Sequence, residues 1–306
     1  MSDNQGPAEK DWHELSEADI LIANIQKYDD DHIVSFYDDE QPGQAYEYLE
    51  HAVTFKVVTD YLRKKGKKDL TAIDVCGGAG KAAFMLHDCG VKDIVLLDSA
   101  QKMLDIASRK ISQNQIEGIV PLQEDALGYL ENTERTFDIL VFSSAIHHFK
   151  DPANLLDLGF KRLAPGGVLI TLGDPTRVVS SSRYLNAVDF FLFLTHRDQR
   201  KVILKSIPAR ITGTYRPPEY KDPAEYQAFL GIEDHGLKNS LVSRGMKPLI
   251  HFRYPAAPSP ILTRIMPYLG LNWAMGMVLA QENNPELSTL LRQAVRRDLP
   301  YKVTVY

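Results

Sequence analysis

The chain of 306 residues has little of what would indicate disulfide stabilisation or secretion. It contains only two cysteines, Cys76 and Cys89, which excludes a disulfide framework as the source of stability. The N-terminal segment "MSDNQGPAEKDWHEL" has no apolar run and predicts no signal peptide. We therefore expect a cytoplasmic protein with an ordinary hydrophobic core, consistent with its 44% of hydrophobic residues.

An excess of positive charge is also missing. The 35 basic and 40 acidic residues give a net charge of −5, which predicts no nucleic-acid partner. The most apolar stretch, 261–280, approaches the length of a membrane span, but Arg264, Pro267, Gly270 and Asn272 interrupt it. We expect a buried or lid helix there and no stable membrane insertion.

Apolar strands alternate with helical segments over residues 70–174, and the strands show no polar alternation. Strands of this kind are buried on both faces, and the strand–helix order is typical of a doubly wound α/β fold with a mostly parallel sheet. The expected strands are 70–75, 93–98, 118–123, 137–144 and 167–174.

The regions outside this alternation predict added helices. We expect residues 1–68 to form an N-terminal helical lid and 69–306 the main domain, with helical insertions at about 175–232 and 255–298. An acidic, tyrosine-rich stretch lies within the lid. Its candidate substrate-binding residues are Tyr28, Tyr37 and Tyr46.

The stretch "AIDVCGGAGKAA", residues 72–83, joins a strand to a helix through glycines. Gly78, Gly80 and Ala83 fit the G-x-G-x-x-A turn of dinucleotide-binding proteins. The helix N-terminus behind such a turn offers N–H groups to an anion, which suits a pyrophosphate or the carboxylate of an amino acid. The turn alone therefore does not identify its ligand.

Acidic residues at neighbouring strand ends favour the amino-acid ligand. Asp74 precedes the glycines, where a carboxylate would bind an ammonium group and repel a pyrophosphate. Asp98 ends the next strand, where it would accept hydrogen bonds from ribose hydroxyls, as it would also for NAD. Asp125 follows the third strand, within reach of an adenine amine.

Four stretches within residues 70–176 together resemble class I S-adenosylmethionine-dependent methyltransferases, in the branch that includes ubiquinone and menaquinone biosynthetic C-methyltransferases. They are "IDVCGGAG", "VLLDSAQKML", "FDILVFSSAIHHFKDP" and "LAPGGVLITLGDP". The resemblance implies S-adenosyl-L-methionine as cofactor and a Rossmann-like sheet of seven strands, the last of them antiparallel.

The resemblance also implies which residues bind the cofactor. Cys76, followed by Gly77, occupies the position of the family's first glycine, which is a departure from the family pattern. The implied cofactor-binding residues are Asp74, Cys76, Gly77, Gly78, Gly80, Asp98, Ser99, Met103, Asp125, Ala126, Ser143 and Ser144.

The residues after the fourth strand are candidates for catalysis. His147 and His148 would face the transferred methyl group as a base or as substrate-orienting groups, and Asp174 is a further substrate-binding candidate. The aromatic and apolar insertions predict a hydrophobic small-molecule substrate, such as a quinone, a prenyl compound, a polyketide or another natural product, methylated on carbon or oxygen.

Two alternatives stay open at this point. One is an NAD-dependent oxidoreductase, which the G-x-G-x-x-A spacing allows. The other is a non-catalytic protein that binds S-adenosylmethionine, because methyl transfer requires no particular side chain. We predict no metal site, and homo-oligomer formation is compatible with the sequence.

Overall fold

The computed structural model describes residues 15–38, 48–176, 224, 231–255, 273–299 and 303–306. One sheet of eight strands organises them, in the order β3-β2-β1-β4-β5-β7-β6-β8. The strands are β1 (Thr71–Val75), β2 (Asp93–Asp98), β3 (Ile119–Gln123), β4 (Phe137–Ser143), β5 (Leu163–Pro175), β6 (Lys247–Pro255), β7 (Trp273–Ala280) and β8 (Thr304–Val305).

The first five strands are parallel to one another, and β7 is antiparallel to both β5 and β6. In β1 and β2, Val75 pairs with Leu97, so both strands end at the same edge of the sheet. The loops after the parallel strands therefore meet there, which is where such sheets bind ligands.

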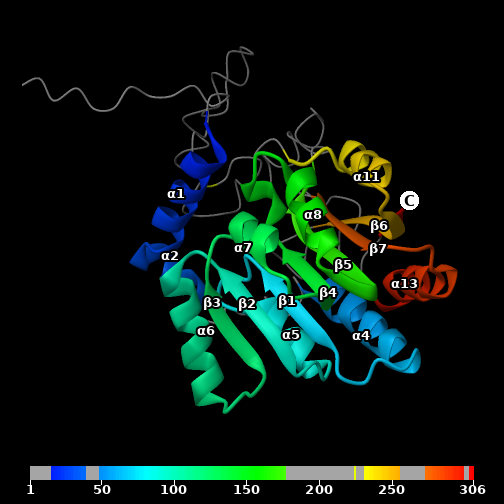
Figure 1. The fold of residues 1–306 in the computed structure, drawn as a ribbon, viewed down its shortest axis with the longest axis horizontal. Coiled ribbons are helices and arrows are strands. Elements are labelled where there is room, and N and C mark those ends of the chain that lie inside the picture. Colours follow the sequence, from blue (N-terminus) through cyan, green and yellow to red (C-terminus); the bar gives the residue numbers. More distant parts are fainter. Residues whose placement is uncertain (1–14, 39–47, 177–223, 225–230, 256–272, 300–302) are drawn as a thin grey trace, which may run out of the picture.

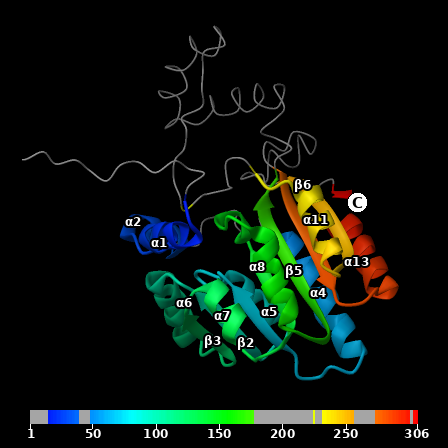
Figure 2. The same cartoon turned by 45° about the horizontal axis from the view of Figure 1, so that its top comes forward.

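Helices cover both faces of the sheet (Figures 1 and 2). The helices are α1 (Glu17–Tyr28), α2 (Asp31–Asp38), α4 (Leu49–Lys64), α5 (Lys81–Asp88), α6 (Gln101–Gln113), α7 (Ala126–Asn132), α8 (Pro152–Lys161), α11 (Asp234–Ser243) and α13 (Pro285–Asp298). Buried residues of α4, α5, α6 and α13 form one core with the sheet, and those of α7, α8 and α11 form the other.

Local signals fix several helix starts. The Asp151 carboxylate accepts the N–H of Asn154 and is followed by Pro152 at the first helical position, so α8 begins there. Asp125 caps α7 in the same way, accepting the N–H of Gly128 at 2.8 Å. These caps anchor the helices close to the ligand-binding edge of the sheet.

The predicted fold class is confirmed, but the described sheet has eight strands instead of the seven expected, and the added regions also need correction. The expected helical insertion at about 255–298 is wrong for residues 273–280, which form β7 between β5 and β6. The strand is apolar along its whole length because neighbours bury both of its faces, and such a run resembles a buried helix in sequence. A Cβ on Gly276 would lie 2.4 Å from the Phe252 ring, so the glycine permits this packing.

The expected lid of residues 1–68 also needs correction, because α4 belongs to the core. Phe55, Val58 and Leu62 of α4 are almost fully buried beside α13 and the sheet. Of the described helices in residues 1–68, α1 and α2 lie above the edge where the parallel strands end (Figure 2). The expected insertion at 175–232 falls largely outside the described residues.

Candidate active site

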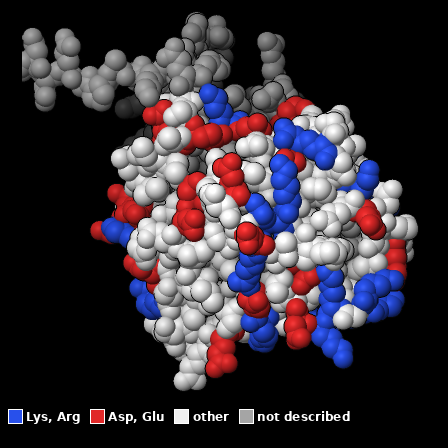
Figure 3. Space-filling model, viewed as in Figure 1, with Lys and Arg blue, Asp and Glu red and all other residues white. Residues whose placement is uncertain are grey.

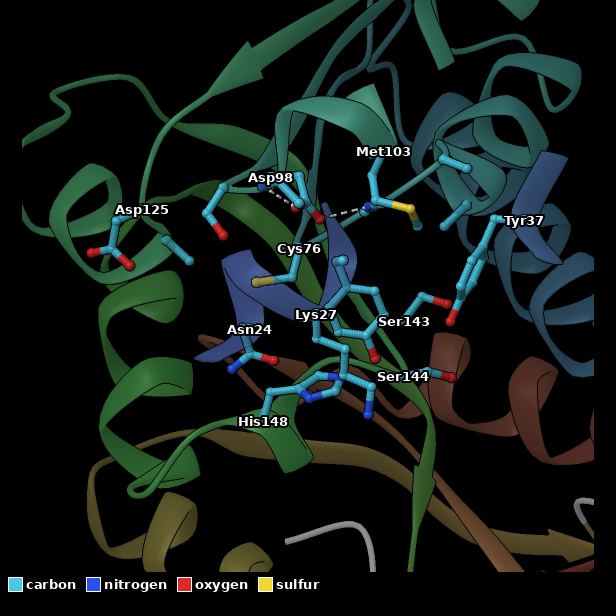
Figure 4. A pocket seen from close by; sticks show the side chains of 18 of the residues that line it. Asn24, Lys27, Tyr37, Cys76, Asp98, Met103, Asp125, Ser143, Ser144 and His148 are labelled. Atoms are coloured by element: carbon cyan, nitrogen blue, oxygen red, sulfur yellow. Dashed lines mark hydrogen bonds between the residues drawn. The ribbon is translucent and has the colours of Figure 1, made fainter. Parts of the chain in front are cut away.

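A cavity of about 1060 Å³ opens at the carboxyl ends of β1, β2, β3 and β4, beneath α1 and α2. This volume lies at the upper end of the range for small-molecule sites, which is compatible with a cofactor and a second small molecule together. Figure 4 shows the side chains of Asp98, Met103, Asp125, Ser143 and His148 around it.

The glycine turn after β1 forms one wall of the cavity. Cys76, Gly78 and Gly80 all have positive φ angles, of 55°, 53° and 85° respectively. Cys76 thus adopts the left-handed conformation that glycine takes without strain, which explains why its position is a glycine in the family pattern. Burial, followed by the charges of Asp98 and Asp125, raises the pKa of the Cys76 thiol well above its usual value, so it is a poor nucleophile.

Asp98 connects this turn to the end of β2. One carboxylate oxygen accepts the N–H of Gly78 and the other accepts the N–H of Ala100, both at 2.8 Å (Figure 4). Burial raises the pKa of Asp98, and the two backbone bonds oppose that effect. Since each oxygen keeps a further lone pair, the carboxylate is oriented to accept two hydroxyl groups, as a ribose requires.

Asp74 lies below the turn, and the lining of the cavity in the described chain does not include it. Its Oδ2 accepts the N–H of Ala83 at 3.0 Å, and its Oδ1 has no hydrogen-bond partner among the described residues. Burial is the largest cause that raises its pKa, to about 7. In this arrangement Asp74 supports the turn and the start of α5, and its contact with the cofactor ammonium, direct or through water, stays a prediction.

The residues expected at the nucleoside line the cavity. Met103 of α6 packs beside the turn, and a Cβ on Gly78 would lie 3.1 Å from the Met103 Cε. Ser99, Asp125 and Ala126 also line it. The turn that glycine keeps open and the partly buried carboxylate of Asp98 fit an adenosine-containing cofactor with a polar tail.

The loop after β4 carries two histidines with different surroundings. Nδ1 of His147 bonds the Asp174 carboxylate at 2.9 Å, while the Thr171 hydroxyl donates to the other oxygen at 3.1 Å. His147 and Asp174 are buried, and neither belongs to the described lining of the cavity. The pair fixes the loop after β4 from behind, and the catalytic role of His147 and the substrate-binding role of Asp174 stay predictions.

His148 does line the cavity, together with Ser143 and Ser144. Its Nδ1 donates to the Ala224 carbonyl oxygen, and its ring packs edge-on against Tyr28 with centroids 5.6 Å apart. His148 is thus the only one of the two predicted histidines that the described structure places at the cavity.

Helices α1 and α2 supply the outer wall. Asn24, Lys27, Tyr28, Ile33 and Tyr37 line the cavity from these helices. The backbone of Lys102 on α6 donates to Asp29 at 2.9 Å, and that of Asp151 donates to Glu17 at 3.0 Å, so the pair of helices is anchored at both ends. Tyr46 lies outside the described residues.

Two buried residues at the start of α4 were missed by the sequence prediction. Glu50 Oε1 lies 3.1 Å from Nδ1 of His51, and Nε2 of His51 lies 2.9 Å from the Ser143 hydroxyl. A signal was present, because His51 falls on the apolar face of its helix with Phe55 and Val58. Its partner is 92 residues away in the sequence, which no local pattern reveals.

The described part of the chain shows neither a metal site nor a membrane-spanning helix. In the described part of the chain, no group of histidine, cysteine and acidic side chains has the arrangement of a metal site. No described helix is both long enough and apolar enough to cross a bilayer.

Comparison with known proteins supports the same cofactor. Residues 72–167 match the model of a family described as "Methyltransferase domain". The tRNA 5-carboxymethoxyuridine methyltransferase of Escherichia coli K12 is 24% identical over 193 residues, covering 61% of this chain and 67% of that protein. The demethylmenaquinone methyltransferase of Lactobacillus johnsonii is 29% identical over 98 residues, covering 31% of this chain and 40% of that protein.

A solved structure has the same fold. The magnesium protoporphyrin IX methyltransferase of Synechocystis PCC 6803, with bound S-adenosylhomocysteine, superposes with a TM-score of 0.54 at 13% identity. The match covers 86% of this chain and 100% of that one.

Fold, turn and matched domain define an α/β enzyme that uses S-adenosylmethionine. The sequence resemblance predicted an S-adenosylmethionine-dependent methyltransferase, and the methyltransferase-domain match over residues 72–167 supports it. The alternative of an NAD-dependent oxidoreductase is thereby set aside.

Proposed function

We propose that the chain transfers the methyl group of S-adenosylmethionine to a carbon or oxygen atom of a hydrophobic small molecule. The observation that carries this proposal is one cavity lined both by the edge of the sheet and by the helices above it. At its cofactor end, Asp98, Met103 and Asp125 line it. Tyr28, the last residue of α1, packs against the cluster of Met103 and also against His148, which lines the cavity beneath the two helices at the other end.

The residues at the cofactor end bind and orient. Asp98 accepts the ribose hydroxyls, Met103 packs against the adenine, and Ser99, Asp125 and Ala126 face its edge. Cys76, Gly77, Gly78 and Gly80 shape the turn around the amino-acid part. When bound, the cofactor supplies a methyl group that is already activated as a sulfonium, so the protein contributes mainly orientation.

The residues at the other end enclose the substrate. Aromatic rings of Tyr28, Tyr37 and Phe149 provide apolar contact, and α1 and α2 act as the lid that excludes water from the reacting atoms. Lys27 and Lys81 also line the cavity, which favours a substrate that carries an acidic or strongly polar group on an apolar body.

The charge distribution supports a small substrate over a nucleic acid. Basic and acidic side chains are interspersed on the face shown in Figure 3, and the net charge is −5. Nucleic-acid affinity depends mainly on basic side chains that neutralise phosphates. The similarity to a tRNA-modifying enzyme makes RNA the substrate class against which the proposal has to be tested.

The test has two parts. Calorimetry with S-adenosylhomocysteine should give saturable binding, and no heat would overturn the cofactor site. The protein is then incubated with [methyl-³H]S-adenosylmethionine and separated small-molecule, RNA and protein fractions of a bacterial extract. We expect label in organic-extractable small molecules; label confined to RNA or protein would overturn the substrate class, and label nowhere would favour the non-catalytic alternative.

A further inference from the structure

We propose that Glu50, His51 and Ser143 form a proton relay that takes the proton from the substrate atom that receives the methyl group. The inference rests on the proposed function and deepens it, because it specifies which kind of nucleophile the site serves. Ser143 touches the substrate, and Glu50 and His51 are positioning residues that act through it.

The three groups are arranged as a hydroxyl, a base that can take its proton, and a carboxylate that orients the base. Ser143 ends β4 and lines the cavity. Its hydroxyl lies 2.9 Å from His51 Nε2, and His51 Nδ1 lies 3.1 Å from Glu50 Oε1. A carboxylate can only accept, so Nδ1 carries the hydrogen and Nε2 presents its lone pair to the Ser143 hydroxyl.

The relay is shielded from solvent except at its serine. Glu50 and His51 are each about 1% exposed. The rings of Tyr48 and Phe55 pack edge-on against His51, with centroids 5.3 and 5.7 Å away. Proton exchange between His51 and the cavity therefore passes through Ser143.

Burying two titratable groups is costly, which argues against a role limited to packing. A contact between α4 and β4 could be made by apolar side chains without desolvating a carboxylate and an imidazole. The charged and titratable neighbours of His51 are few in the described structure. Glu50 and Tyr48 lie on its own helix, and Lys81 of α5 reaches the Tyr48 ring at 3.6 Å from its centre.

The relay accepts the proton that the substrate releases during methyl transfer. The substrate atom forms its bond to the methyl carbon as the carbon–sulfur bond breaks, with that electron pair kept by sulfur. The substrate proton moves to Ser143 Oγ while the Ser143 hydroxyl proton moves to His51 Nε2. The resulting imidazolium faces the Glu50 carboxylate, and the proton returns through Ser143 to solvent after product release.

The nature of the substrate follows from this balance. A hydroxyl group or an enolisable C–H must lose a proton during methyl transfer, and general-base assistance is useful for both. A carboxylate is already ionised at neutral pH and has no proton to give. The relay therefore points to a hydroxyl or an acidic carbon as the methylated group.

A thiol at position 143 tests the relay without a substrate. In the Ser143→Cys variant, His51 should take the thiol proton and form a thiolate–imidazolium pair. We measure the rate of alkylation by iodoacetamide against pH, with peptide mass spectrometry to separate position 143 from Cys76 and Cys89. The midpoint should fall at least about 1.5 pH units below the ordinary thiol value of about 8.5.

The matched control adds His51→Gln in the same background. Glutamine keeps a hydrogen bond to position 143 but cannot take the proton, so the midpoint should return toward the ordinary thiol value. If His51→Gln prevents folding, Glu50→Gln replaces it, because the amide still bonds Nδ1 but removes the charge that supports the imidazolium. Equal midpoints with and without the substitution would overturn the relay.

Calorimetry with S-adenosylhomocysteine separates this proposal from the proposed function. We expect wild type and His51→Gln to bind it within about twofold of each other. Binding by both, with no effect of His51 on the thiol midpoint, overturns the relay and leaves the cofactor site standing. Failure of both to bind, with a His51-dependent midpoint, overturns the proposed function instead.

Discussion

Two aspartates at opposite ends of the sheet, the partly buried Asp98 and the buried Asp234, satisfy their charge in different ways. Asp98, at the parallel end, bonds backbone N–H groups of Gly78 and Ala100, and burial raises its pKa. Asp234, at the antiparallel end, bonds His251 at 2.8 Å and Arg253 at 2.7 Å. Burial raises the pKa of Asp234 too, but the bonds from His251 and Arg253 lower it well below its ordinary value.

We propose that the difference separates a structural carboxylate, Asp234, from a carboxylate that binds a ligand, Asp98. Asp234 is neutralised within the protein, where it ties α11 to β6. Backbone N–H groups orient Asp98 but bring no full positive charge, so a ligand that donates hydrogen bonds can improve its environment. Substitutions at the two positions should therefore affect different properties.

The largest effect is expected for Asp234→Ala, which leaves the buried His251 and the partly buried Arg253 without the carboxylate that pairs with both. We expect the free energy of unfolding to fall by about 3–5 kcal/mol, as for broken buried ion pairs. Urea denaturation at pH 7 measures it, and S-adenosylhomocysteine affinity should stay unchanged where the variant is folded. Since the folded-state pKa is lowered, the wild-type contribution is present above about pH 4 and lost as the pH falls further.

Asp98→Ala should show the opposite pattern, with lost affinity and little loss of stability. Two charge-assisted hydrogen bonds to the ribose contribute about 3 kcal/mol together, so the Kd for S-adenosylhomocysteine should rise about 100-fold. Asp93→Ala, at the other end of β2 in an exposed pair with Arg135, is the matched control. A change below about threefold for Asp98→Ala would contradict the assigned role.

Asp74→Asn tests a third carboxylate, whose pKa of about 7 is raised by burial. A raised folded-state pKa means that the group favours folding below its unfolded pKa, and that this contribution is lost as the pH rises through about 7. The amide oxygen can still accept the Ala83 N–H. We compare the free energy of unfolding of Asp74→Asn with that of the wild type at two pH values. The difference should favour the variant by about 1–2 kcal/mol more at pH 8.5 than at pH 5.5. The pH dependence of thermal unfolding measures it. A pH-independent difference would show that Asp74 does not titrate in this range.

The smallest effect is expected for Cys76→Gly. Glycine relieves the left-handed backbone strain but loses the partly buried side chain, so the net gain should be about 0.5–1 kcal/mol. Thermal unfolding measures it. Cys89→Gly is the control, because Cys89 has a negative φ of −73°. This substitution should destabilise the protein instead.

The cofactor end of the site was predictable because its determinants are local. A strand, a glycine turn and an acidic residue at the next strand end place Asp98, Gly78 and Met103 from sequence alone. Side-chain direction was not predictable: Asp74 and Asp174 lie at the expected strand ends but turn into the core. The Glu50–His51–Ser143 contact depends on how α4 packs across the sheet, which only the three-dimensional fold establishes.

The two outermost strands affect how copies of the chain could associate. Edge strand β3 contains Pro121, which lacks an N–H, and the opposite edge is β8 of two residues. β8 pairs only with Phe252 and Arg253 of β6, and the carbonyl oxygens of Leu249 and His251 accept the Ser288 hydroxyl and the Tyr306 N–H. Within the described residues, neither border therefore offers the long uninterrupted run of backbone donors and acceptors that an incoming β-strand would need. We therefore expect copies of the chain to associate through their helical faces. The shape of the cavity then does not depend on a sheet formed between copies.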